Sequence, residues 1–70
     1  MYKRKISDGL REVATAYDGI AQNLFNAARL LEENEEYNLE ERAINAVRIA
    51  ESSTVELRNL AGRLVQRDVN

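Results

Sequence analysis

The 70-residue chain contains no cysteine, no histidine and no proline. Without cysteine it forms neither a disulfide nor a thiolate metal site. Without histidine it lacks the usual ligand of zinc and iron and the commonest general base. A domain this small usually needs a staple such as a disulfide, a metal or oligomerisation. Oligomerisation is the staple that remains, so we expect the chain to self-associate.

Long apolar runs are also missing. No segment approaches the roughly 20 apolar residues of a membrane span. The basic start, residues 1–5, is not followed by the apolar stretch of a secretory signal. The formal net charge is −2, so composition does not indicate a polyanion binder. We therefore expect a soluble cytoplasmic protein without a membrane partner, and the lack of cysteine agrees with a reducing compartment.

Apolar residues recur every three or four positions through most of the chain, in two stripes. The first stripe consists of Ile6, Leu10, Val13, Tyr17, Ile20, Leu24, Ala27 and Leu31. The second consists of Ala43, Val47, Ala50, Thr54, Leu57, Ala61 and Leu64. Only helices packed lengthwise on other helices need this spacing. The sequence therefore predicts an all-α fold.

The two stripes predict two long helices joined by a short turn, which makes them antiparallel. Ser7 is a candidate N-cap for the first helix, and Asn38 with Glu41 is a candidate capping box for the second. We expect a single helical-hairpin domain over residues 1–70, with a helix over about 6–33, a turn over about 34–38 and a helix over about 39–67.

Small residues flank the first stripe at Ala14, Ala21 and Ala28, and they favour a close approach of the two helix axes. Counting outward from the turn, we expect Gly9 to lie opposite Gly62 as a second contact of small residues.

The same count brings Tyr17 near Ser53 and Thr54. A buried phenol needs a hydrogen-bond partner. We expect these hydroxyls to supply it and to form a polar layer that fixes the register, whereas the alternative leaves Tyr17 reaching solvent.

Charges segregate along the predicted hairpin. Lys3, Arg4, Lys5, Arg11, Arg58, Arg63 and Arg67 fall at the open end, and Glu32, Glu33, Glu35, Glu36, Glu40 and Glu41 crowd the turn. Two such rods associate most favourably antiparallel, with each acidic turn against the partner's basic end. We expect a homodimeric, antiparallel four-helix bundle. Its self-association residues are Leu10, Val13, Tyr17, Ile20, Leu24, Leu31, Val47, Leu57, Leu60 and Leu64.

A candidate partner surface lies on the outside of the first helix. Gln22, Phe25, Asn26 and Arg29 combine amides, an aromatic ring and a cation where water is expected. Such a patch suits a protein partner or a nucleic-acid base. The alternative interpretation is that Phe25 and Leu30 widen the apolar stripe.

No motif for catalysis, cofactor binding or metal binding is present, and the glutamates near the turn are typical of a solvated turn. We expect no enzymatic activity, no cofactor and no small-molecule substrate. The first hypothesis is a small regulatory or interaction protein whose partner macromolecule is another protein. The second is an RNA- or DNA-binding bundle that uses the outer face of the first helix and the basic open end. Net acidity weakens the second hypothesis, because phosphate neutralisation drives such binding.

Overall fold

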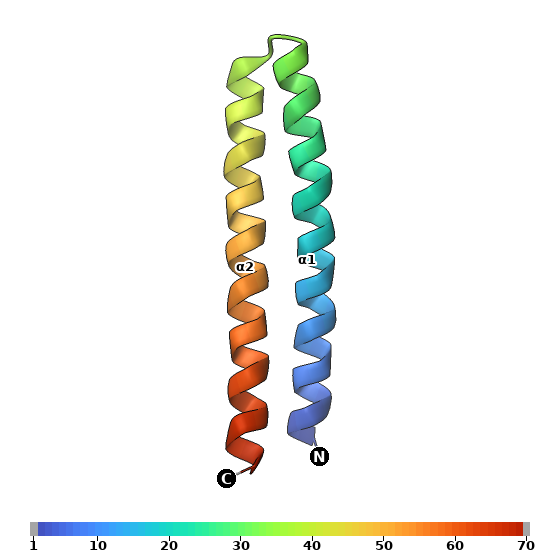
Figure 1. Ribbon diagram of the computed structural model, residues 1–70, viewed down its shortest axis with the longest axis vertical. Helices are drawn as coiled ribbons and strands as arrows, with labels where there is room; N and C mark the ends of the chain where they lie inside the picture. The colour runs from blue at the N-terminus through green and yellow to red at the C-terminus, as the bar shows by residue number, and fades with distance from the viewer. Residues whose placement is uncertain (1, 70) are drawn as a thin grey trace.

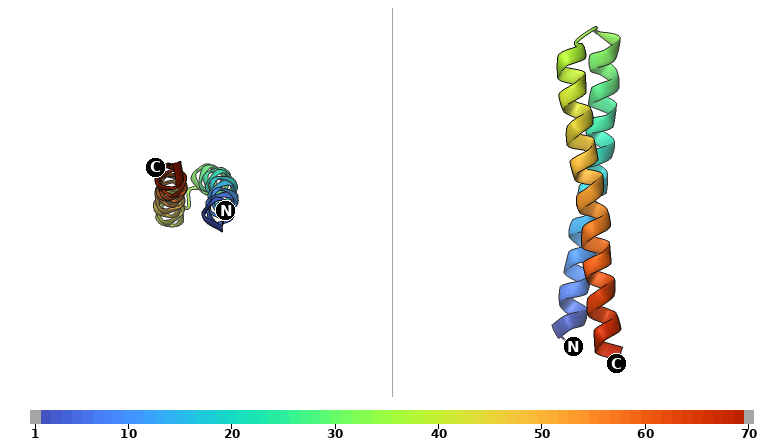
Figure 2. Two further views of the ribbon diagram at one scale, coloured as in Figure 1. Left: turned by 90° about the horizontal axis from the view of Figure 1, so that it is seen from below. Right: turned by 90° about the vertical axis from the view of Figure 1, so that its left-hand side faces the viewer.

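The protein is a single antiparallel helical hairpin. The computed structural model describes residues 2–69, with side chains for residues 2–66. Helix α1 spans Tyr2–Glu33 and helix α2 spans Tyr37–Val69. The helices lie side by side as a rod whose Cα atoms extend over 53 × 13 × 10 Å (Figures 1 and 2). The predicted all-α hairpin is confirmed.

Both helices begin earlier than the sequence suggested. Helix α1 already includes Tyr2, so Ser7 lies inside the helix and the N-cap prediction is wrong. The Glu40 amide donates to the Glu36 carbonyl over 2.9 Å, which makes Glu36 the N-cap of α2. Asn38 is then the second residue of α2 and cannot act as the N-cap of a capping box.

The turn is shorter than predicted because α1 ends in a Schellman motif. The Glu36 amide donates to the Leu31 carbonyl over 2.8 Å, and the Glu35 amide donates to the Glu32 carbonyl over 3.0 Å. Glu35 adopts the left-handed conformation, with φ of 61°, at the position where glycine is usual. Only residues 34–36 separate the helices.

The two helices meet through small side chains. The buried residues of α1 recur every seventh position, at Ser7, Ala14, Ala21 and Ala28. Those of α2 are Val47, Ala50, Thr54 and Ala61, which are four of the seven residues of the predicted second stripe. The first stripe does not face α2 in the same way, because its flanking alanines occupy the contact.

Two hydroxyls connect the helices through backbone carbonyls. The Ser7 hydroxyl donates to the Ala61 carbonyl over 3.0 Å. The Thr54 hydroxyl lies 3.4 Å from the Ala14 carbonyl and 3.0 Å from the Ala50 carbonyl, within donating distance of both. A short side chain bonds to a neighbouring backbone only where the axes approach closely. The register is therefore Ser7 opposite Ala61 and Ala14 opposite Thr54.

This register corrects two expectations. Gly9 and Gly62 are not contact points, since a Cβ atom added at either would meet nothing within 4 Å. The expected polar layer around Tyr17 is replaced by the bonds of Ser7 and Thr54 to backbone carbonyls. Tyr17 is 36% exposed, as the alternative interpretation required.

Candidate interaction surfaces

The hairpin has two unlike broad faces, which the helical period defines. The contact line follows every seventh residue, Ser7, Ala14, Ala21 and Ala28 on α1 and Glu40, Val47, Thr54 and Ala61 on α2. On each helix, the residues one before and three after each of these positions lie to one side of the contact line. In an antiparallel pair these two sides belong to the same face of the rod. The side chains of this apolar face are Ile6, Leu10, Val13, Tyr17, Ile20, Leu24, Ala27 and Leu31 of α1, and Leu39, Ala43, Ala46, Ala50, Ser53, Leu57, Leu60 and Leu64 of α2.

The apolar face remains substantially open to solvent. Ile6, Val13 and Ile20 are 47%, 46% and 49% exposed, and Leu39 and Leu60 on α2 are 48% and 43% exposed. Among the side chains that the structure describes, the buried apolar ones are five alanines and one valine. Most of the large apolar side chains of the protein therefore lie outside the contact between its two helices.

Of the predicted self-association residues, all except Val47 lie on the apolar face. Val47 is buried between the helices, in a cluster with Ala21 and Ala50 against which Leu24 packs. The sequence period could not distinguish a residue buried between the two helices from one on the apolar face. Val47 belongs to the same predicted stripe as Leu57 and Leu64, which lie on the apolar face.

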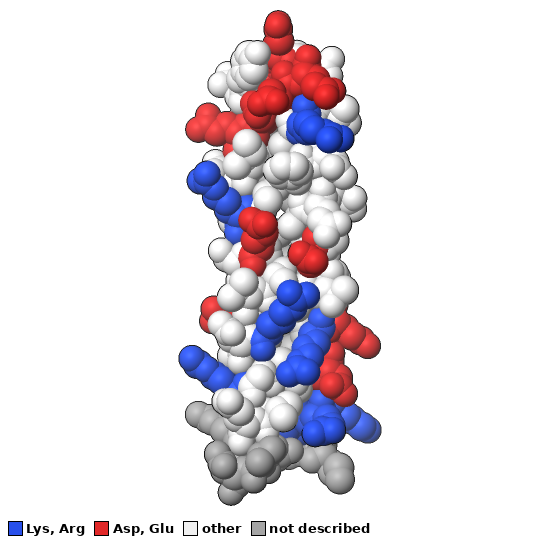
Figure 3. All heavy atoms as spheres, viewed as in Figure 1, with Lys and Arg blue, Asp and Glu red and all other residues white. Residues whose placement is uncertain are grey.

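The opposite face carries charges of both signs, and we name it the charged face (Figure 3). One hollow on it is lined by Asp18, Gln22, Phe25, Asn26 and Glu51 together with Ala21 and Val47. A second hollow is lined by Phe25, Ala28, Arg29, Glu32, Glu40 and Ile44. The structure thus brings Gln22, Phe25, Asn26 and Arg29 together around two adjoining hollows.

Phe25 does not widen the apolar stripe in the hairpin. Its side chain is 60% exposed and lies on the charged face, between the two hollows. Leu30 is also exposed, at 55%. The interpretation of Phe25 as part of the helix–helix core is therefore wrong for the contact between α1 and α2.

Sequence reasoning missed the carboxylates that flank Phe25. Asp18 and Glu51 line one hollow, and Glu32 and Glu40 line the other. Desolvation by burial raises the pKa of Glu40 above its ordinary value, and the charge of Glu32 and a hydrogen bond with its side chain raise this pKa further. The sequence did not indicate these carboxylate pairs, because Asp18 and Glu51, like Glu32 and Glu40, come from different helices.

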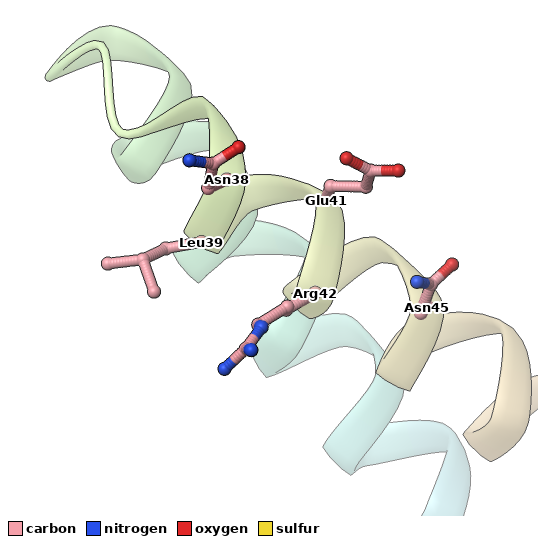
Figure 4. A pocket seen from close by; sticks show the side chains of 5 residues that line it. All are labelled: Asn38, Leu39, Glu41, Arg42 and Asn45. Carbon is pink, nitrogen blue, oxygen red and sulfur yellow. The ribbon is translucent and has the colours of Figure 1, made fainter.

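Another shallow hollow lies on the outside of α2 near the turn. Its lining residues are Asn38, Leu39, Glu41, Arg42 and Asn45. In Figure 4, Leu39 and Arg42 point to one side of the helix, and Glu41 and Asn45 point to the other. Because all five belong to one helix, the hollow has no opposing wall that would enclose a ligand.

Charge varies along the rod as the sequence predicted. Acidic side chains gather at the turn, and most of the basic ones on the charged face lie in the other half (Figure 3). Near the turn, six glutamates outnumber the two arginines of that region, Arg29 and Arg42. Towards the open end, six lysines and arginines up to Arg63 outnumber Asp8, Glu12 and Glu56. The side chain of Arg67 lies outside the described residues.

Among the described residues, no cluster of three or more carboxylate, thiol or imidazole groups has the arrangement of a metal site. Within the same range, neither helix carries an apolar segment of the length that crossing a bilayer requires. Comparisons with protein-family models, curated protein sequences and solved structures find no match.

Proposed function

We propose that this chain is a non-enzymatic interaction protein of the cytoplasm that self-associates through its apolar face and binds a second protein through its charged face. The open apolar face carries this proposal. A side of a small rod lined with leucine, isoleucine and valine is unfavourable in water and is typical of a protein–protein interface.

The exposed area supports self-association. A compact monomer of 8.0 kDa exposes about 4,450 Å² by the usual scaling of surface with mass. The hairpin exposes 5623 Å², about 1,200 Å² more. Each partner of a standard interface loses about 800 Å². The excess is therefore large enough for one stable interface per chain.

The charged face supports a partner with basic side chains. Phe25 offers an exposed aromatic ring, and aromatic residues are enriched among those that dominate binding energy. The carboxylates of Asp18, Glu51, Glu32 and Glu40 line the hollows on either side of the ring. An arginine or lysine side chain placed there would gain ion pairs and contact with the ring.

The experiment that tests self-association compares two aspartate substitutions. Val13 on the apolar face and Val55 on the other side of the rod are 46% and 59% exposed, so neither belongs to the hairpin's own core. We expect sedimentation equilibrium to give a dimer for the parent chain and for Val55→Asp. Val13→Asp should weaken dimerisation at least about 100-fold, because each interface would bury two unpaired carboxylates. A parent chain that stays monomeric at high concentration would rule out the proposed function.

Nucleic-acid binding is the second candidate, and the exposed Phe25 beside Arg29 is the observation in its favour. The four flanking carboxylates oppose it, since they repel phosphate. We expect no gel-shift or anisotropy change with labelled RNA at low salt. A specific complex that Phe25→Ala and Arg29→Ala both abolish would instead assign this face to RNA.

A further inference from the structure

We propose that two copies pack their apolar faces together with their turns at opposite ends, so that α1 lies along the partner's α1 and α2 along the partner's α2. This inference rests on the proposed self-association and adds its geometry. The alternative places both turns at the same end, with α1 along the partner's α2.

The apolar face is self-complementary in spacing. Along α1 its residues are separated by 4, 3, 4, 3, 4, 3 and 4 positions, from Ile6 to Leu31. The same intervals recur along α2 from Leu39 to Leu64. A series that reads the same in both directions lets each helix pair with an antiparallel copy of itself in uninterrupted layers.

The layers can be read from the sequence. On α1, Ile6 would meet the second copy's Leu31, and Tyr17 would meet its Ile20. On α2, Leu39 would meet the second copy's Leu64. The midpoints fall between residues 18 and 19 on α1 and between 51 and 52 on α2. Since Ser7 lies opposite Ala61, these midpoints are about two residues, or 3 Å, apart along the rod. A single two-fold axis across the rod therefore serves both helix pairs.

Side-chain size distinguishes the two arrangements. With turns at opposite ends, Leu10 meets Ala27 and Leu60 meets Ala43, so each layer combines large and small side chains. With turns at the same end, Leu10 and Leu60 of both copies share one layer, and Ala27 and Ala43 of both copies share another. Interiors are packed at nearly uniform density. Four leucines in one layer and four alanines in another do not satisfy that condition in a straight bundle.

Charge favours the same choice. Opposite-end packing brings the six glutamates around each turn, Glu32 to Glu41, towards the basic open end of the other copy. Same-end packing would gather twelve glutamates at one end and the lysines and arginines at the other. The two independent criteria, size and charge, therefore select the same dimer.

Pulsed electron–electron distance measurements on nitroxide-labelled single-cysteine variants test the arrangement, and the chain has no native cysteine to interfere. Asn38→Cys places the label on the exposed outside of α2 near the turn. From the rise per residue, opposite-end packing separates the two labels by at least about 40 Å. Same-end packing leaves only the width of the bundle between them, about 20–30 Å.

Gly19→Cys is the matched control, because it lies next to the expected two-fold axis and a Cβ atom there meets nothing within 4 Å. In either dimer its two labels are separated by no more than the width of the bundle. A short distance at Gly19→Cys with a long one at Asn38→Cys supports the proposal. Short distances at both sites overturn the orientation and leave self-association intact. No dipolar coupling at Gly19→Cys indicates a monomer, which overturns the proposed function as well.

Discussion

At the scale of single residues, Glu35 occupies the most costly backbone conformation in the described chain. It is the only described non-glycine residue with positive φ. Glycine adopts this conformation without the steric penalty of a Cβ atom. We expect Glu35→Gly to raise the free energy of unfolding by about 1 kcal/mol, measured by urea denaturation at fixed protein concentration.

Glu35→Gln is the control for that substitution, since it removes the same negative charge from the acidic turn and keeps the side chain. If the backbone is the cause, Glu35→Gly is the more stable of the two variants. Equal stability of the two variants would assign the gain to charge.

Glu40 gives stability a dependence on pH. Its native pKa is raised, so folding favours its protonated form. This contribution is fully present below the ordinary glutamate pKa of 4.5 and is lost as pH rises through the raised native value. We expect Glu40→Gln to be more stable than the parent at pH 7 and to lose this part of the pH dependence.

The matched control is Glu41→Gln, which removes an exposed neighbouring carboxylate. The quantity to compare is the slope of unfolding free energy against pH just above 4.5. Identical slopes for the Glu40 and Glu41 variants would contradict the role given to Glu40.

At the scale of the helices, the contact depends on the alanine side chains of α1. Ala14 is 0% exposed and its carbonyl accepts a hydrogen bond from Thr54. A leucine there would force the axes apart, and overpacking of this kind usually costs about 1–3 kcal/mol. Ala16→Leu, at an exposed position of the same helix, should change stability by under about 0.5 kcal/mol. Chemical denaturation of both variants tests this, and equal effects would mean that the helices do not meet at Ala14.

The sequence predicted the two helices well, because a 3.5-residue period over seven or eight positions is a strong signal. It could not show which side of each helix meets the other. Helix α1 has three adjacent columns of apolar or small residues, headed by Ile6, Ser7 and Leu10. Any two of them form a plausible stripe. The column with the smallest side chains faces α2, since it permits the closest approach.

The missed turn and caps have a different cause. Glu35 gives no indication of a left-handed conformation, which sequence patterns assign to glycine or asparagine. Ser7 resembles an N-cap because serine is common there. Its hydroxyl instead bonds to Ala61, which is 54 residues away along the chain and therefore invisible to local patterns.

At the scale of the whole molecule, the hairpin's own buried core is small. Within residues 2–66 it holds five alanines and one valine, with Ser7 and Thr54 as its buried polar groups. If the large apolar residues are buried only in a dimer, dimerisation supplies much of the stability. We expect the thermal midpoint to rise by several degrees per tenfold increase in protein concentration, measured by circular dichroism. A midpoint independent of concentration would show that the hairpin is stable alone.

The hairpin register also decides how the molecule comes apart. The chain runs out from the turn and back, so residues 2 and 69 lie at the same end of the rod (Figure 1). A force that pulls these ends apart acts across the helix pair, not along it. The Ser7–Ala61 bond breaks first, then the contact of Ala14 with Thr54, and the turn last. At each step the force acts on only one layer of contacts between α1 and α2. The two helices therefore separate layer by layer, at low force.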